Sequence, residues 1–169
     1  MRTSKTIFTA IISIMWVQFA FAEAPDWVDN PGGYQFTATL AAAVVLNPQG
    51  GVISGDGNDI LAAFDAAGNC RGIALNLTAA AGTYDGQMIH EMQIRSNDVG
   101  DLITFQFYDA SADQILLVDL DYEFVINDVI GSLFDVQEVV ASPPLQGCTD
   151  SGANNYNPAA NVDGCCDFD

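Results

Sequence analysis

Basic residues are almost absent from this chain. Its one lysine is Lys5 and its arginines are Arg2, Arg71 and Arg95, against 22 aspartates and glutamates. A nucleic-acid-binding protein needs a basic surface to meet the phosphates, so this shortage argues against a nucleic-acid partner. It argues equally against attraction to an anionic membrane surface.

Catalytic motifs are also lacking. The chain has one histidine, His90, and no G-x-S-x-G elbow, H-E-x-x-H pair or phosphate-cradling glycine loop. His90 shares a predicted strand face with Met88, Met92 and Ile94, which favours a packed or rim histidine over a catalytic base. Two carboxylates can cleave a glycoside, but among 22 acidic residues such pairs arise by chance. We therefore expect no enzyme, and a glycoside-acting hydrolase is the less favoured alternative.

The chain contains only one long apolar run, which lies at the N-terminus. Arg2 and Lys5 come just before an apolar stretch over residues 6–19, and the small-x-small sequence Ala20-Phe21-Ala22 follows it. These are the features of a secretory signal peptide. The run is shorter than the roughly 20 residues that span a bilayer. We expect residues 1–22 to be cleaved, leaving a protein without a membrane span that is secreted or held at the cell surface.

After this cleavage the chain is strongly acidic. It keeps Arg71 and Arg95 against all 22 acidic residues, a formal net charge of −20 (2 − 22). Self-repulsion of this kind is screened by salt or neutralised by bound divalent cations. The sequence is nevertheless 50% hydrophobic and 10% aromatic, which suffices for a core and is unlike an acidic disordered chain.

Apolar residues recur mostly at every second position, and no segment shows the spacing of an amphipathic helix. Clusters of Gly, Asn and Asp separate these stretches, which is typical of short strands joined by turns. We expect an all-β fold, an antiparallel β-sandwich of about eight strands within residues 23–142. Strands are predicted at residues 34–46, 60–66, 71–77, 88–95, 103–107, 116–124 and 136–141.

The clearest alternation lies in residues 116–124. The side chains expected to face the core are Leu116, Val118, Leu120, Tyr122 and Phe124. Those expected to face solvent are Asp119, Asp121 and Glu123. A register error of one residue would invert both sets, so this strand is a sharp test of the fold.

The last part of the chain differs from the rest. Pro143-Pro144 ends the final strand and begins a stiff linker over residues 143–146. Residues 147–169 are rich in Asn, Asp, Gly and Ala, and they have too few aliphatic side chains for a core of their own. An even number of cysteines in an exported chain favours disulfides, and no C-x-x-C pair suggests zinc. The four cysteines are Cys70, Cys148, Cys165 and Cys166.

Two stretches are candidate calcium sites, because Ca²⁺ prefers oxygen ligands in flexible loops. The first consists of Asp56, Asn58 and Asp59. The second lies in the tail and consists of Asp150, Asn155, Asn157 and Asp163. Each has a structural alternative. The first is also the pattern of a turn in which Asp and Asn bond their own backbone, and the second that of a disulfide-closed turn held by Asn side chains.

Two further residues have an expected role. Arg71, one of two cations in an acidic molecule, is expected to pair with a carboxylate at a sheet end. Asn76-Leu77-Thr78 is a glycosylation sequon, which matters only if the source is eukaryotic.

The tail contains, in order, Gly147-Cys148-Thr149-Asp150, Ala153, Asn155-Tyr156-Asn157-Pro158, Ala160, Asp163 and Gly164. This series resembles a short module, G-C-T-D-x-x-A-x-N-Y-N-P-x-A-x-x-D-D-G-S-C, of secreted and surface proteins of marine Bacteroidota and some marine eukaryotes. One aspartate of that pattern is missing, and Cys165 stands in place of the usual serine. The resemblance implies that Cys148 pairs with Cys166. Cys165 is then left either to pair with Cys70 or to stay free for an intermolecular bond.

The body carries its own landmarks: Trp27, Tyr34-Gln35-Phe36-Thr37, Asn58-Asp59 with Ala63-Phe64, Cys70-Arg71-Gly72, Ile103-Thr104-Phe105 with Tyr108-Asp109-Ala110, and Asn127-Asp128-Val129-Ile130-Gly131-Ser132. Together they resemble a β-sandwich module found in the same kinds of secreted, multidomain proteins. The resemblance implies a non-catalytic extracellular module without a defined ligand.

These observations favour a secreted structural or adhesive surface module, with calcium as a candidate stabilising ion. The expected partner is a surface glycan, a protein or a second copy of the chain. The alternative is a carbohydrate-binding module, by analogy of fold. A glycan binder should show an exposed row of Trp or Tyr, whereas the chain after residue 22 has only Trp27 and tyrosines that lie mostly in predicted strands.

Overall fold

The computed structural model describes residues 24–168, so the predicted signal peptide lies outside the described residues. No helix in this range is long and apolar enough to cross a membrane. The helical content of the range is a single 3₁₀ turn, η1 (Pro31–Gly33). The described chain is therefore all-β, as the alternation of apolar residues predicts.

The strands lie close to the predicted segments. They are β1 (Phe36–Leu46), β2 (Ile60–Asp65), β3 (Cys70–Ile73), β4 (Leu75–Thr78), β5 (Met88–Ser96), β6 (Leu102–Asp109), β7 (Gln114–Glu123), β8 (Val129–Ile130), β9 (Gln137–Ser142), β10 (Gln146–Gly147) and β11 (Val162–Asp163). The predicted strand at residues 71–77 is divided into β3 and β4, because this segment changes its pairing partner midway.

The body is one nine-stranded sheet in the order β3-β2-β6-β7-β9-β1-β5-β4, with β8 paired to β1. Strand β1 is parallel to β8 and β9 and antiparallel to β5. All other neighbouring strands of this sheet are antiparallel. β8 lies beside residues 39–40 and β9 beside residues 43–46. They therefore act as one strand along β1, interrupted at residues 131–136. The alternation of apolar and polar residues shows which side chains are buried, but it does not show whether a neighbouring strand is parallel or antiparallel. The parallel pairing was therefore not predictable from the sequence pattern.

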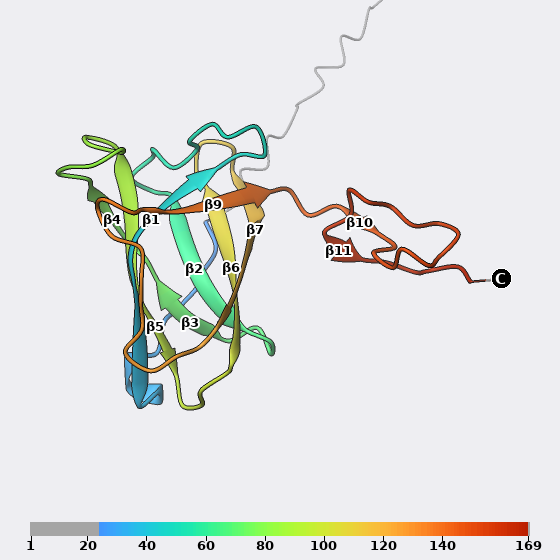
Figure 1. Cartoon of the computed structure of the whole chain (residues 1–169), viewed down its shortest axis with the longest axis horizontal. Helices are drawn as coiled ribbons and strands as arrows, with labels where there is room; N and C mark the ends of the chain where they lie inside the picture. Colours follow the sequence, from blue (N-terminus) through green and yellow to red (C-terminus); the bar gives the residue numbers. More distant parts are fainter. Residues whose placement is uncertain (1–23, 169) are drawn as a thin grey trace, which may run out of the picture.

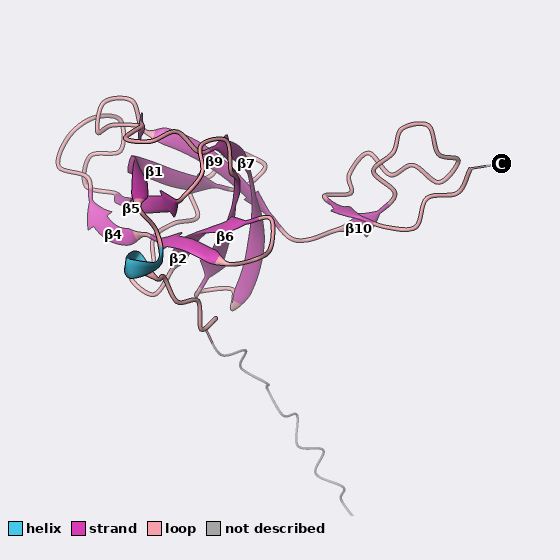
Figure 2. Cartoon of the chain, turned by 90° about the horizontal axis from the view of Figure 1, so that it is seen from below, coloured by secondary structure: helices cyan, strands magenta, loops and turns pink. Residues whose placement is uncertain are grey.

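The two ends of this path meet, because β3 and β4 are parts of one extended segment over residues 70–78. Its first half pairs with β2 and its second half with β5. Gly72 lies so close to β5 that a Cβ atom there would be 2.5 Å from the carbonyl oxygen of Gln93. The predicted sandwich is thus rolled into a barrel-like body, and Figures 1 and 2 show its strands wrapping around an interior.

Burial along β7 follows the predicted alternation. Val118 is 8% exposed while its neighbour Asp119 faces solvent, so the register is confirmed. The other predicted core residues divide into Leu116 and Phe124, which are buried, and Leu120 and Tyr122, which are only half-buried. The largest fully buried side chains of the barrel include Phe107, Phe124, Leu40, Leu61, Ile94 and Ile103.

The tail lies outside the barrel. Its strands β10 and β11 form a separate, two-stranded parallel sheet. Figure 1 shows the tail extending sideways from the end of β9, and the view at right angles in Figure 2 shows the same separation.

Candidate functional site

Arg71 of β3 contacts three other segments of the barrel. Its guanidinium lies 2.8 Å from the Asp65 carboxylate and 3.5 Å from that of Asp101, and it stacks 4.3 Å from the ring centre of Tyr34. The predicted pairing with a carboxylate is confirmed. Burial raises the pKa of Asp65, but hydrogen bonds from Asn69 and the Arg71 charge outweigh this and lower it to about 2. Arg71 is therefore a structural cation at this end of the barrel.

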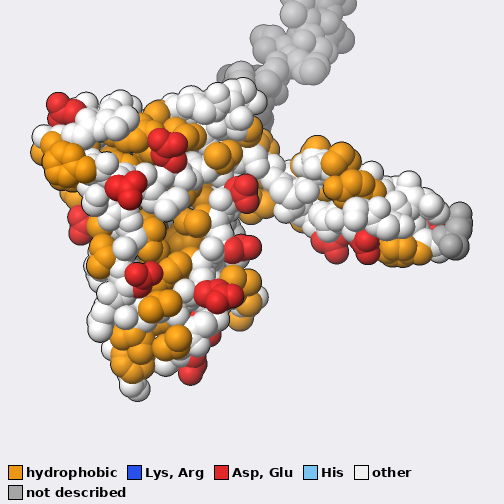
Figure 3. All heavy atoms as spheres, viewed as in Figure 1, with side chains coloured by type: hydrophobic (Ala, Val, Ile, Leu, Met, Phe, Trp, Pro, Cys, Tyr) orange, Lys and Arg blue, Asp and Glu red, His pale blue; other side chains and the backbone are white. Residues whose placement is uncertain are grey.

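Arg95 is engaged in the same way. It forms an ion pair with Asp29, in the segment that precedes β1, and both side chains are largely buried. Within residues 24–168 both basic side chains are thus neutralised internally. On the face drawn in Figure 3, acidic side chains lie among hydrophobic ones and no Lys or Arg is visible.

His90 is the packed histidine that the strand pattern predicts. It is fully buried, and its ring packs edge-on against Phe107 with centroids 5.8 Å apart. Its Nδ1 lies 2.8 Å from Oδ1 of Asn76, whose Nδ2 donates to the carbonyls of Asp59 and Gly57. Because the amide orientation is set by those two carbonyls, Nδ1 of His90 carries the proton and donates.

The other ring nitrogen of His90, Nε2, has no hydrogen-bond partner within the described residues. Burial lowers the pKa of His90 to about 4, although the nearby Asp59 charge acts in the opposite direction. The sequon residue Asn76 uses its Nδ2, the atom that a glycan would modify, inside this network. His90 and Asn76 together join β5, β4 and the loop before β2.

The first candidate calcium stretch forms a tight loop before β2. Asp59 is 3% exposed, and its carboxylate accepts hydrogen bonds from the backbone amides of Gly55, Asp56 and Ala110. The Asp56 carboxylate accepts from the backbone and side-chain amides of Asn58. This is the Asx-turn arrangement that is the structural alternative for this stretch.

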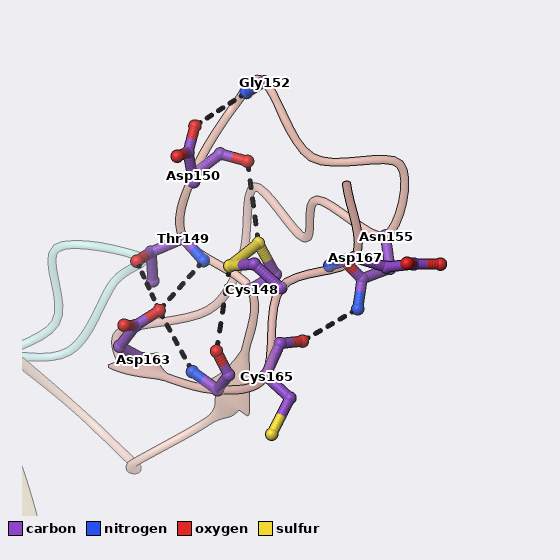
Figure 4. Close-up of a disulfide and its surroundings, with 10 residues drawn as sticks. Cys148, Thr149, Asp150, Gly152, Asn155, Asp163, Cys165 and Asp167 are labelled. Atoms are coloured by element: carbon purple, nitrogen blue, oxygen red, sulfur yellow. Dashed lines mark hydrogen bonds between the residues drawn. A yellow bond between two sulfur atoms is a disulfide. The ribbon is translucent and has the colours of Figure 1, made fainter. Parts of the chain in front are cut away.

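The tail is closed by the predicted disulfide. Cys148 and Cys166 are joined, with their Cα atoms 4.9 Å apart. Cys70 and Cys165 are free thiols, so the alternative in which these two pair is not formed. Cys165 is exposed, and Figure 4 shows its sulfur directed away from the disulfide.

Three residues of the second candidate calcium stretch, Asp150, Asn155 and Asp163, lie around this disulfide (Figure 4). Asp163 accepts a 2.9 Å hydrogen bond from the Thr149 hydroxyl, and Asp150 accepts one from the backbone amide of Gly152. The remaining two predicted ligands also hold backbone: Asn155 bonds Cys165 and Asp167, and Asn157 bonds Ala159. All four side chains therefore fasten the loop to itself.

The predicted calcium ligands belong to two distinct loops, one before β2 and one in the tail. In the part of the chain that the structure describes, no three His, Cys, Asp or Glu side chains come close enough together to hold a metal ion. Calcium binding therefore stays a prediction.

A groove of about 520 Å³ lies on the outer face of β6, β7 and β9, beside the tail. On β6 and β7 the more accessible lining residues, such as Thr104, Gln106 and Asp119, alternate with Phe105 and Val118, which also border the groove but bury their side chains in the core. The groove therefore lies outside the barrel. The residues that line it are Pro48, Thr104, Phe105, Gln106, Leu117, Val118, Asp119, Asp121, Val140, Ser142 and Asn161. Sequence reasoning placed Asp119 and Asp121 on the solvent side but did not identify a groove, because its strands are brought together by long-range pairing.

An irregularity in β7 shapes the acidic side of the groove. Ile103 of β6 pairs with Tyr122, but Phe105 pairs with Val118, so residues 119–121 of β7 stand opposite a single residue of β6. Such a bulge re-aims side chains locally. It places two exposed carboxylates, two residues apart, at the groove.

Asn161 fastens the tail at one end of the groove. Its Nδ2 donates to the Ser142 hydroxyl and to the Pro143 carbonyl, each at 3.0 Å, and its Oδ1 accepts from the backbone amide of Leu145. A tail residue thereby reaches back to the last strand of the barrel.

Exposed aromatic side chains do not form a row. Among the described residues the exposed ones are Phe134, Tyr156 and Phe168, which lie in separate loops, and Trp27 is half-buried against Phe64. The one aromatic residue lining the groove, Phe105, is buried. The groove therefore lacks a ring on which a sugar would stack.

Comparison of the chain with protein-family models, curated proteins and solved structures gives no match.

Proposed function

We propose that the protein is a secreted, non-catalytic structural or adhesive module of the cell surface or the extracellular medium. The observation that carries this proposal is a disulfide-closed polar tail held out from a barrel-like acidic body. A disulfide suits an oxidising compartment, and a tail without a core of its own requires such a closure. The resemblance of both parts to modules of marine surface proteins supports the same proposal.

The arrangement of ionisable groups supports a non-catalytic role. His90 is fully buried, and Arg71 and Arg95 are each committed to an ion pair. The two groove carboxylates, Asp119 and Asp121, project from one strand. Carboxylates that cleave glycosides flank the bond from two sides, which a pair on one strand does not do.

The carbohydrate-binding alternative lacks the platform on which it depends. Flat aromatic side chains supply much of the contact area in binding sites of amphipathic ligands. No exposed Trp or Tyr lies in the groove, and the exposed aromatics of the described chain stand apart. We therefore rank the structural or adhesive function first.

Three measurements test this function. Mass spectrometry of protein secreted by the source cells should show a chain that begins at Glu23, and protease treatment of intact cells should remove any surface-bound protein. A full-length chain starting at Met1 in the cytosolic fraction would contradict export. Turnover of any member of a glycan panel by the purified protein, lost in an Asp119→Asn variant, would contradict the non-catalytic assignment.

A further inference from the structure

We propose that the groove on β6, β7 and β9 binds an extended peptide segment of another protein, and that this segment carries lysine or arginine. The proposal rests on the adhesive function above and deepens it by naming a partner class. Three properties of the groove lead to it: its shape, its charge and its unengaged polar side chains.

The size and lining of the groove suit a long side chain with a charged end. Its volume of about 520 Å³ lies within the range of protein ligand sites. Its apolar lining includes Leu117 and Val140, which are half-buried, and the carboxylates of Asp119 and Asp121 lie beside them. Lysine and arginine have the same two parts, an apolar stem that packs on apolar surface and a cationic head.

The negative charge of the groove favours a cationic partner, and residues 24–168 of the chain do not supply a free cation. No ion pair within residues 24–168 involves Asp119 or Asp121. The arginines of this range, Arg71 and Arg95, are both paired elsewhere, and no lysine occurs in it. Residues 24–168 of a second copy therefore offer no free basic side chain to place in the groove. The partner must bring its own cation.

The remaining polar side chains favour a peptide over an isolated cation. Thr104 and Gln106 lie two residues apart on β6, are half-buried, and make no side-chain hydrogen bond within the described residues. Together they offer donors and acceptors to a peptide backbone, which has one of each at every residue. The carboxylates of Asp119 and Asp121 then form ion pairs with the basic side chains of that peptide.

The test is a binding titration with the full secreted chain, monitored by fluorescence anisotropy at low ionic strength. The probe is a labelled, end-capped peptide Gly-Lys-Gly-Lys-Gly, and its matched control carries acetyl-lysine at both lysines. Acetylation keeps the stem and removes the charge. We expect binding of the lysine peptide and at least about fivefold weaker binding of the acetylated one, the size expected for two solvent-accessible ion pairs.

Variants distinguish the groove from the general acidity of the protein. Asp119→Asn with Asp121→Asn should weaken lysine-peptide binding at least about fivefold. The matched control, Asp85→Asn with Asp98→Asn, removes the same charge at exposed positions that do not line the groove, and should change affinity less than about twofold. Gln106→Arg, which supplies a cation from the chain itself, should abolish binding. Melting curves of each variant establish that it is folded.

Three results would overturn the proposal. Equal weakening by the two double variants would show attraction to net charge alone. Equal binding of the acetylated peptide would show that the cation is not recognised. Binding of a neutral oligosaccharide, lost in the groove variants, would assign the groove to glycans. None of these results bears on export or on the absence of catalysis, so failure of the groove proposal and failure of the proposed function are distinguishable.

Discussion

The barrel and the tail are stabilised by different means. The barrel buries large apolar side chains such as Phe107 and Phe124, both 0% exposed. Among tail residues 147–168 the buried side chains are only Cys148 and Ala153, and the tail loops are held by one disulfide and by Asp and Asn hydrogen bonds. Burial of apolar surface scales with size, so a segment of this length has no comparable source of stability. The two parts should therefore respond to different perturbations.

Truncation of a core side chain should have the largest effect, and only on the barrel. Phe107→Ala removes a fully buried ring and should cost about 3–5 kcal/mol of unfolding free energy. Denaturant titration measures this loss. The matched control, Phe134→Ala, removes a ring that is 81% exposed and should stay within about 0.5 kcal/mol. Similar losses in the two variants would mean that the core is wrongly assigned.

Acid should weaken the barrel through His90. Its pKa is lowered from 6.5 to about 4 in the folded protein, so the unfolded chain binds more protons between these values. Stability is then fully present above pH 6.5 and falls by about 3 kcal/mol as the pH drops to 4. Urea titrations across this range measure the slope, and a His90→Gln variant should lack it. An unchanged slope in that variant would assign the effect to other groups.

The lowered pKa of Asp65 acts in a separate window. Its value falls from 3.8 to about 2, so the stability it contributes is present above pH 3.8 and is lost as the pH falls towards 2. The loss of stability through His90 therefore occurs at higher pH than the loss through Asp65, so a pH titration of unfolding distinguishes the two.

Calcium should raise the melting temperature if the predicted loops bind it. A site with the affinity of extracellular calcium modules contributes about 1 kcal/mol at millimolar Ca²⁺. Calorimetry in CaCl₂ should therefore show a higher melting temperature than in NaCl of equal ionic strength. Asp163→Asn should abolish a shift that arises in the tail, and Asp56→Asn one that arises before β2. Coincident melting curves in the two salts would contradict calcium binding.

Asn161 should have the smallest effect, since it sets position more than stability. Asn161→Ala removes hydrogen bonds to Ser142, Pro143 and Leu145 at an exposed site, with an expected cost of about 0.5–1.5 kcal/mol. Small-angle scattering should show a more variable distance between tail and barrel than in the parent chain. Identical scattering profiles would mean that the linker, and not Asn161, holds the tail.

Local patterns predicted what depends on a single strand or turn. Alternation in β7 identified Val118 as buried and Asp119 as exposed, because a strand directs successive side chains to opposite faces. The pairing of Cys148 with Cys166 followed from a resemblance that covers one short segment, and the structure confirms it.

Features that depend on distant pairing were not predictable in this way. The segment over residues 70–78 closes the barrel because its first half pairs with β2 and its second half pairs with β5. The spacing of apolar residues within the segment does not indicate these partners. The groove is formed by strands β6, β7 and β9 and by the bulge at residues 119–121 of β7. The free state of Cys70 and Cys165 likewise depends on how far apart the fold places them.

The central claim is that burial of apolar side chains stabilises the barrel, whereas a disulfide stabilises the tail. The most direct test is hydrogen exchange, measured by mass spectrometry, of the Cys148→Ser, Cys166→Ser double variant. Opening this loop should cost the tail about 3 kcal/mol in the chain-entropy model. Amides of residues 147–168 should lose their protection, while those of β1, β6 and β7 keep theirs. Loss of protection in the barrel strands as well, or an unchanged tail, would contradict it.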